Sequence, residues 1–104
     1  MNPELPWNGE AVCLLREWRG LSAAEATRAM SQEPGCARVR QQYLIGWEGR
    51  AVTGGVARTK EPARPLYAEA LRKVLGADSV LDFYLPTREF VAKYKIKVQR
   101  RERG

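Results

Sequence analysis

The sequence predicts a mainly α-helical domain of five helices followed by a C-terminal β-strand. In several stretches between residues 9 and 85, apolar residues recur every three or four positions, as they do on the buried face of an amphipathic helix. After Pro86 they recur at every second position instead, which is the period of a strand. A chain of 104 residues is long enough for one domain with a single hydrophobic core.

Capping signals give the bounds of the first two helices. Asn8 is a suitable N-cap for a helix over residues 9–19. Ser22 and Glu25 have the spacing of a capping box. We therefore expect a second helix that begins after Ser22 and continues to Met30.

The third, fourth and fifth helices are delimited by proline and glycine. A Pro-Gly turn precedes the third helix, which is expected to begin at residue 36 or 37 and to end at residue 48. The loop at residues 49–62 is long enough to predict a functional or disordered role. Pro65 suits the first position of the fourth helix, and Gly76 suits its end. A cap at residue 78 or 79 predicts a short fifth helix, which Pro86 stops.

The predicted strand lies in residues 87–99. Because a lone strand cannot satisfy its own backbone hydrogen bonds, we expect it to pair with the same strand of a second copy, in a homodimer, or with the sheet edge of another protein. A helix that starts at Thr87 is the alternative for this segment. The basic tail at residues 100–104 is expected to be disordered. The residues expected to form the dimerisation strand are Phe90, Ala92, Tyr94, Ile96 and Val98.

Composition favours a polyanionic partner and argues against an enzyme. The net charge is +6, and most of the 18 basic residues are arginine, which binds phosphate and guanine bidentately. Nucleic acid is the leading candidate, and an acidic protein is the alternative. Histidine, the commonest general base and metal ligand, is absent from the sequence, so we expect no catalysis, no metal or other cofactor and no small-molecule substrate.

Neither cysteine indicates a metal or redox site, and no segment indicates a membrane. Cys13 and Cys36 lack C-x-x-C spacing, and Cys13 is expected to be a small core residue. No apolar run reaches the length of about 18 residues that crosses a bilayer, and the N-terminus lacks a signal-peptide pattern. We therefore expect a reduced, cytoplasmic protein.

The third helix carries side chains that suit DNA recognition at its N-terminal end. Leu44 and Trp47, three residues apart, fall on one face, where they can pack against the domain. On other faces, Arg40 can bind guanine, and Gln41 or Gln42 can bind adenine, through paired hydrogen bonds in the major groove.

Other residues in and around this helix have two interpretations. Tyr43 and Ile45 can contact a thymine methyl group, and a core position is the alternative for Tyr43. Gly46 costs a helix about 1 kcal/mol relative to alanine, which indicates either fraying or a close approach of the backbone to DNA. Each flanking basic residue either neutralises a phosphate or remains an ordinary solvated charge. The candidates for phosphate binding are Arg38, Arg50, Arg58, Lys60 and Arg64.

Three stretches, in this order, resemble the Cro/C1-type (XRE-like) helix-turn-helix family of phage repressors and small bacterial regulators. Residues 15–25, which include RGLSAAE, are similar to the end of the family's first helix and the start of its second. The stretch QQYLIGWE at residues 41–48 is similar to its recognition helix, and residues 66–85 are similar to its closing helix pair. Residues 31–39 exceed the family's tight turn, so either the helix pair is splayed or the recognition helix is extended backwards.

The resemblance implies a regulator that binds double-stranded DNA with residues 9–86, after an extended lead-in at residues 1–8. The helix at residues 37–48 would read the major groove of a palindromic operator, as a repressor of phage or bacterial type. The resemblance also implies a partly buried ion pair between Arg16 and Glu48, with two separate solvated charges as the alternative. The alternative function is a protein-interaction module, such as an antitoxin or phage adaptor, that captures its partner through the C-terminal strand.

Overall fold

The computed structural model describes residues 6–36, 38–49, 62 and 64–97, and these residues form five α-helices, one 3₁₀ helix and no strand. The mainly helical class predicted from the sequence is thus confirmed for this part of the chain. Residues 50–61 of the predicted loop at residues 49–62 lie outside the described residues, as does the basic tail. In chain order, the elements are α1 (Gly9–Trp18), α2 (Ala23–Met30), α3 (Gln41–Glu48), α4 (Pro65–Leu75), η1 (Val80–Tyr84) and α5 (Thr87–Tyr94).

The predicted caps explain where three of the helices begin and where α4 ends. The side chain of Asn8 accepts hydrogen bonds from two backbone N–H groups in the first turn of α1. The Ser22 hydroxyl accepts the Glu25 N–H at 3.1 Å, and the Glu25 carboxylate accepts the Ser22 N–H at 2.9 Å, which completes the capping box. Pro65 opens α4, and Gly76 ends it with a φ of 70°.

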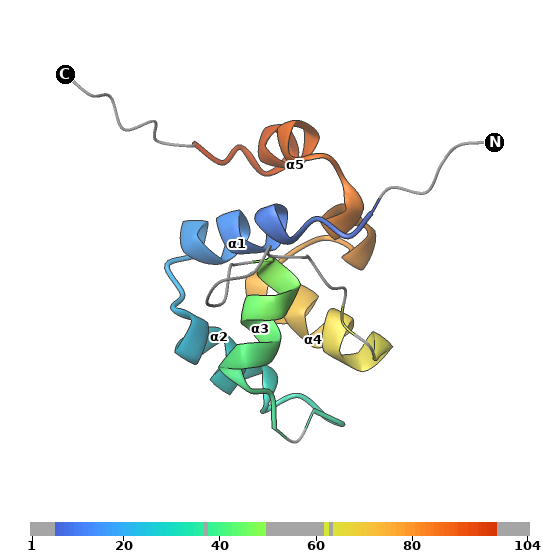
Figure 1. Cartoon of the computed structure of the whole chain (residues 1–104). Helices are drawn as coiled ribbons and strands as arrows, with labels where there is room; N and C mark the ends of the chain where they lie inside the picture. The colour runs from blue at the N-terminus through green and yellow to red at the C-terminus, as the bar shows by residue number, and fades with distance from the viewer. Residues whose placement is uncertain (1–5, 37, 50–61, 63, 98–104) are drawn as a thin grey trace, which may run out of the picture.

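Helix α1 crosses the middle of the domain, with α5 on one side and α2, α3 and α4 on the other (Figure 1). It contacts α3, α5 and η1, while α2 contacts both α3 and α4. Helix α3 stands at the front of this view, where it is held by α1 and α2 together. The largest fully buried side chains of the core are Val12, Leu15, Met30, Cys36, Leu44, Leu71, Leu75, Phe83 and Phe90.

The predicted fifth helix is the 3₁₀ helix η1. Its cap is Ser79, whose hydroxyl accepts the backbone N–H of Leu81 at 3.1 Å. The segment between this cap and Pro86 has room for little more than one turn, and short turns of this kind commonly take the tighter 3₁₀ form. Phe83, at its centre, is fully buried.

The C-terminal strand predicted after Pro86 is wrong for the described residues, because Thr87–Tyr94 is the helix α5. Phe90 and Tyr94 are four residues apart, a spacing that places them on one face of a helix as well as on one face of a strand. Phe90 is fully buried, and its ring lies 6.2 Å from that of Phe83 and 4.7 Å from that of Tyr94. A helix also satisfies its own backbone hydrogen bonds, which a lone strand cannot. The alternative, a helix starting at Thr87, is therefore the correct one.

Because residues 87–94 form a helix, the face that a strand would have offered for dimerisation does not form there. Phe90 and Ile96 are buried in the core of their own domain, and the Tyr94 hydroxyl is engaged by Asp82. Ala92 lies exposed on α5, and Val98 lies outside the described residues. An adaptor that captures its partner by pairing with this strand loses its structural basis for the same reason.

A buried carboxylate fastens α5 to η1. Asp82 is 6% exposed, and its carboxylate accepts hydrogen bonds from the Lys93 ammonium at 3.0 Å and from the Tyr94 hydroxyl. Burial alone would raise the pKa of the Asp82 carboxyl, but the hydrogen bonds from Lys93 and Tyr94 outweigh burial and lower it. Burial and the hydrogen bond to Asp82 also raise the pKa of Tyr94 to about 12, which keeps its hydroxyl protonated.

We expect this contact to weaken in acid. Because the pKa of Asp82 is lower in the folded protein than its ordinary value of 3.8, the ionised carboxylate stabilises the fold above that pH. The contribution is lost as the pH falls through the lowered, folded-state pKa. In urea unfolding from about pH 7 down to about pH 2, the stability deficit of Asp82→Asn should therefore shrink as the pH falls.

The control is Asp78→Asn, because the Asp78 side chain is 73% exposed and lies 3.8 Å from Lys93. This variant should show a much smaller deficit at neutral pH. A deficit for Asp82→Asn that stays constant across the pH range would contradict the assignment.

Candidate nucleic-acid interface

The last turn of α3 is fixed against the start of α1. Leu44 is fully buried and Trp47 is 6% exposed. The Trp7 indole N–H donates to the backbone carbonyl of Trp47 at 2.8 Å. Gly9, the first residue of α1, lies so close that a Cβ built there would be 2.5 Å from the same carbonyl oxygen. Helix α1 therefore packs directly on the backbone of α3.

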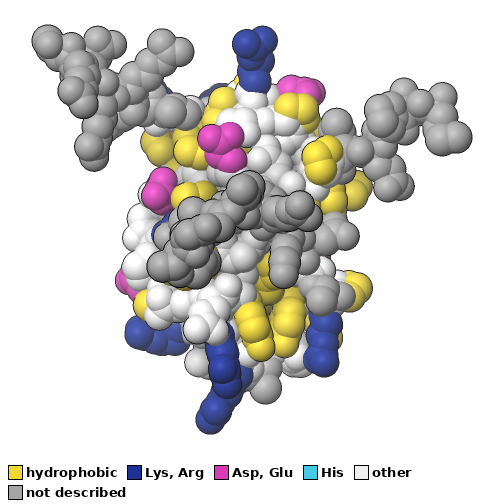
Figure 2. All heavy atoms as spheres, in the orientation of Figure 1, with side chains coloured by type: hydrophobic (Ala, Val, Ile, Leu, Met, Phe, Trp, Pro, Cys, Tyr) yellow, Lys and Arg dark blue, Asp and Glu magenta, His cyan; other side chains and the backbone are white. Residues whose placement is uncertain are grey.

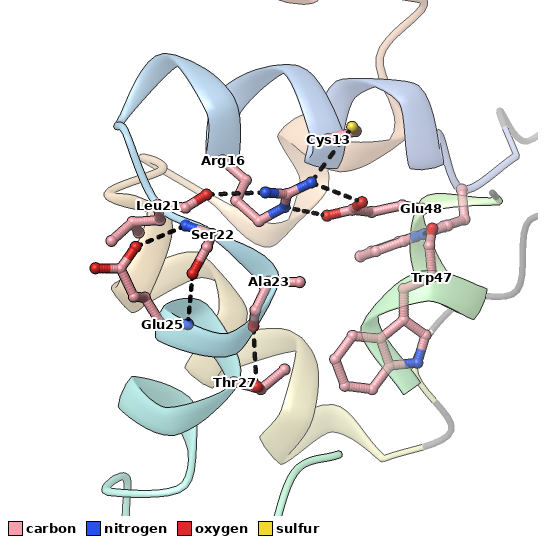
Figure 3. A network of polar contacts seen from close by, with 10 residues as sticks. Cys13, Arg16, Leu21, Ser22, Ala23, Glu25, Thr27, Trp47 and Glu48 are labelled. Carbon is pink, nitrogen blue, oxygen red and sulfur yellow. Dashed lines mark hydrogen bonds and ion pairs between the residues drawn. The ribbon is translucent and has the colours of Figure 1, made fainter. Parts of the chain in front are cut away.

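The ion pair implied by the family resemblance joins Arg16 on α1 to Glu48 at the end of α3 (Figure 3). Arg16 Nε donates to Glu48 Oε2 at 2.6 Å, and Arg16 Nη2 donates to Glu48 Oε1 at 3.2 Å. The Arg16 side chain is 7% exposed and the Glu48 side chain is 0% exposed. Arg16 Nη1 also donates to the carbonyl of Leu21, between α1 and α2, at 2.8 Å. The hydrogen bond to Glu48 raises the pKa of Arg16, so its guanidinium stays charged. The alternative of two solvated charges is wrong.

Cys13 lies beside this pair and is not a reactive thiol. It is half-buried, so its predicted place as a core residue is only partly correct. Arg16 Nη2 donates to its sulfur at 3.7 Å. Burial, and after it the Glu48 carboxylate, raise the pKa of the thiol to about 11. Cys13 therefore stays protonated at neutral pH and offers no nucleophile.

Of the predicted base-reading residues, Gln42 lies on the side of α3 that faces away from the core. With about 100° between successive residues, Gln42 and Gly46 point away from the buried side of the helix. Ile45 is half-buried next to them. The structure thus gathers the exposed candidates at the N-terminal end of α3. They are Arg40, Gln41, Gln42 and Tyr43.

The long connection between α2 and α3 is packed on the core. Helix α3 begins at Gln41, so the earlier start predicted from the sequence is wrong, and the helix is not extended backwards. Cys36 and Val39 are buried, and the Val39 N–H donates to the Ser31 hydroxyl at the end of α2, at 2.9 Å. Cys36 and Val39 therefore anchor the connection to the core, and the connection leads directly into the exposed end of α3.

Two of the five candidates for phosphate binding lie in the described part of the chain. Arg38 and Arg64 are both exposed. Arg64 is the N-cap residue of α4, and its guanidinium lies 5.9 Å from the centre of the Tyr67 ring. The remaining three candidates lie outside the described residues. They are Arg50, Arg58 and Lys60.

The starts of α3 and α4 differ in charge from those of the other helices. Helices α1, α2 and α5 each have a glutamate in the first turn, which complements the positive end of the helix dipole. Helices α3 and α4 have no acidic residue there, and their N-cap residues, Arg40 and Arg64, make no side-chain capping hydrogen bond. Positive charge at a helix start is unfavourable until an anion binds. Both starts are thus suited to phosphate.

An aromatic cluster connects α3 to α4 beside this exposed end. Tyr43 is 43% exposed, so it is not a core residue, and its ring lies 6.3 Å from that of Trp47 and 6.4 Å from that of Tyr67. Together with Arg64, these three residues line a depression of about 260 Å³. Figure 2 shows a hydrophobic patch with Lys and Arg side chains on both sides, on the lower part of the face that presents α3 and α4. Tyr67 is not among the residues that the sequence predicts for this site.

The class of protein must be inferred from this surface, since no protein-family model, curated protein or solved structure matches the chain. Among the described residues, no group of three or more His, Cys, Asp and Glu side chains is placed to hold a metal ion. None of the described helices combines the length and the apolar character needed to cross a membrane. The most distinctive surface of the described chain is the exposed, basic and aromatic end of α3 and α4.

Proposed function

We propose that this protein is a sequence-specific, double-stranded-DNA-binding transcriptional regulator that places α3 in the major groove. The observation that carries the proposal is that one short helix combines a firmly held side with an exposed polar end. Base recognition needs both properties, because a side chain must be held in register with the base edges that it reads. The resemblance to the Cro/C1-type family supports the same role and suggests a repressor of phage or bacterial type.

The side chains at the exposed end of α3 match the base edges of the major groove. Arg40 can donate two hydrogen bonds to guanine O6 and N7. Gln41 and Gln42 can each accept from adenine N6 and donate to N7. Tyr43 and Ile45 add apolar surface for a thymine methyl group. These five residues are the proposed base-reading set.

Phosphate binding is assigned to the arginines beside the helix starts. Arg38 and Arg64 are exposed next to α3 and α4, and Arg40 can reach a backbone phosphate where it does not contact a base. An anion at either helix start would offset the repulsion between the arginine charge and the positive end of the helix dipole. The net charge of +6 adds a general attraction to DNA that salt would screen.

Selection of bound sites from a random duplex library tests this function. A sequence-specific regulator should enrich a defined motif and bind it less tightly as salt rises, because phosphate contacts release counterions. An inverted repeat with centres about 34 Å apart would indicate a dimer, whereas a single half-site would indicate a monomer. Failure to enrich any motif would contradict the proposal.

Substitutions in the two groups of residues should weaken binding in different ways. Gln42→Ala should reduce discrimination at one base pair by about 1–3 kcal/mol. Arg38→Ala should weaken binding to all sequences alike and lower the salt slope by about one. The matched control is Arg88→Ala, which removes the same charge from α5, on the other side of α1 (Figure 1). Titrations by fluorescence anisotropy at several salt concentrations measure these effects. Equal losses for Arg38→Ala and Arg88→Ala would show that net charge alone matters.

A further inference from the structure

We propose that the depression between α3 and α4 binds an unpaired nucleobase, so that the protein binds single-stranded nucleic acid. The described residues that line the site are three aromatic ones, Tyr43, Trp47 and Tyr67, together with Arg64. The inference does not depend on the proposed regulator function, because a base outside a duplex is bound through its flat face and its phosphate, without a major groove.

The rings of the depression offer a surface on which a base can stack. Tyr43, Trp47 and Tyr67 lie within 5.9 to 6.4 Å of one another, with angles of 32° to 42° between their planes. Trp47 is buried and Tyr67 is half-buried, whereas 43% of Tyr43 is exposed, so Tyr43 is the most exposed ring of the cluster. Single-strand-binding proteins use exposed aromatic rings in this way, because every base has a flat aromatic face.

The size of the depression fits one flat group. Its volume is about 260 Å³, and it is open to the surface. Sites that enclose a drug-sized ligand are larger, at roughly 300 to 1,000 Å³. A single base that stacks on Tyr43 while the strand continues past the site matches this shape better than an enclosed ligand does.

The charges at the depression select an anionic ligand. The Arg64 guanidinium lies 5.9 Å from the centre of the Tyr67 ring, so Arg64 already makes the cation–π contact that this ring could offer to a cationic ligand. A cationic ligand would meet this arginine, and none of the lining residues that the structure describes is a carboxylate. A nucleotide combines a flat aromatic base with an anionic phosphate, and therefore matches both the rings and the arginine. An apolar peptide would match the rings alone.

The test is the affinity of the protein for a fluorescein-labelled single strand of about 12 nucleotides, measured by anisotropy. Tyr43→Leu keeps an apolar side chain but removes the ring, and it should weaken single-strand binding about tenfold. Tyr43→Phe keeps the ring and should bind almost as the wild type does. The matched control is Trp18→Leu, which removes an equally exposed ring, at 45%, from the end of α1 and should change little. Thermal unfolding followed by circular dichroism verifies that each variant is folded.

Tryptophan fluorescence gives a second readout of the same site. Stacking of a base against the cluster that contains Trp47 should quench part of the emission in the wild type and in Trp18→Leu, and much less in Tyr43→Leu. Equal single-strand affinities for Tyr43→Leu, Trp18→Leu and the wild type would overturn the proposal, as would a failure of the wild type to bind the strand. If a protein segment occupied the depression in place of a base, the single-strand affinity would likewise not depend on Tyr43.

Duplex binding, measured in parallel, keeps the two proposals separate. A wild type that binds the selected duplex but not the single strand would retain the regulator function and remove this inference. A wild type that binds the single strand in a Tyr43-dependent manner, but enriches no duplex motif, would retain this inference and remove the regulator function.

Discussion

Replacing Arg16 by methionine should lower the free energy of unfolding by about 3–5 kcal/mol. The Glu48 carboxylate, whose side chain is 0% exposed, would lose both hydrogen bonds from the guanidinium, and the carbonyl of Leu21 would lose its own. A buried charge that loses its opposite charge is expensive, because water no longer solvates it. The loss is a large part of the roughly 5–15 kcal/mol that stabilises a typical domain. Urea unfolding followed by circular dichroism measures it.

The Arg16→Met/Glu48→Leu double variant separates the stability that the ion pair contributes from the cost of leaving one of its charges buried alone. It should regain most of the stability lost in Arg16→Met, because neither charge of the pair remains in the core. The exposed pair between Lys73 and Glu33, with 3.5 Å between its atoms, is the control. Lys73→Met should change stability by about 0–1 kcal/mol. If Arg16→Met cost no more than Lys73→Met, the buried pair would not be what holds α3 to α1.

The bounds of several helices could be predicted because local chemistry determines them. The capping hydrogen bonds that the Asn8 side chain accepts, and those of the Ser22–Glu25 capping box, join residues at most three positions apart. Pro65 and Gly76 act through their own backbone conformations. Such signals are present in the sequence whatever the rest of the fold does. The polar end of α3 was visible for the same reason, as neighbouring residues of one short stretch.

The errors arose where packing decides between two local options. Phe90 and Tyr94 fit either a strand or a helix, and the contact of Phe90 with Phe83 selects the helix. Helix α5 ends at Lys95 with a φ of 55°, without the glycine that usually indicates such an end. The start of α3 was placed too early because the burial of Val39 depends on contacts with the rest of the domain.

The aromatic depression could not have been predicted from one stretch of sequence. Tyr43 and Trp47 belong to α3 and Tyr67 to α4, and the loop between these helices carries no signal of how they meet. An aromatic residue in the first turn of a helix that follows a basic loop was a weak available signal for Tyr67. Its combination with Arg64 and Tyr43 becomes visible when the two helix starts are brought together.

Alanine substitutions at Gly9 and at Gly46 should change stability in opposite directions. At Gly9, the added Cβ would lie 2.5 Å from the Trp47 oxygen and 2.6 Å from the Glu48 carbonyl carbon. Both contacts are with backbone, so α1 would have to move away from α3, and the free energy of unfolding should fall by about 1–3 kcal/mol or more. At Gly46, no atom from the rest of the described chain lies within 4 Å of the added Cβ. Because alanine favours a helix, Gly46→Ala should raise the free energy of unfolding by about 1 kcal/mol.

The Gly46 variant also tests how α3 meets DNA. Gly46 points away from the core, on the same side as Gln42, so an added methyl group would project towards a bound duplex. We expect Gly46→Ala to be more stable than the wild type and yet to bind the selected duplex less tightly. Unfolding and anisotropy titrations on the same preparation measure the two quantities. Unchanged or tighter binding would indicate that the glycine weakens the helix without making room for DNA. A loss of affinity combined with a gain in stability cannot arise from unfolding, so it would identify Gly46 as a point of close approach to DNA.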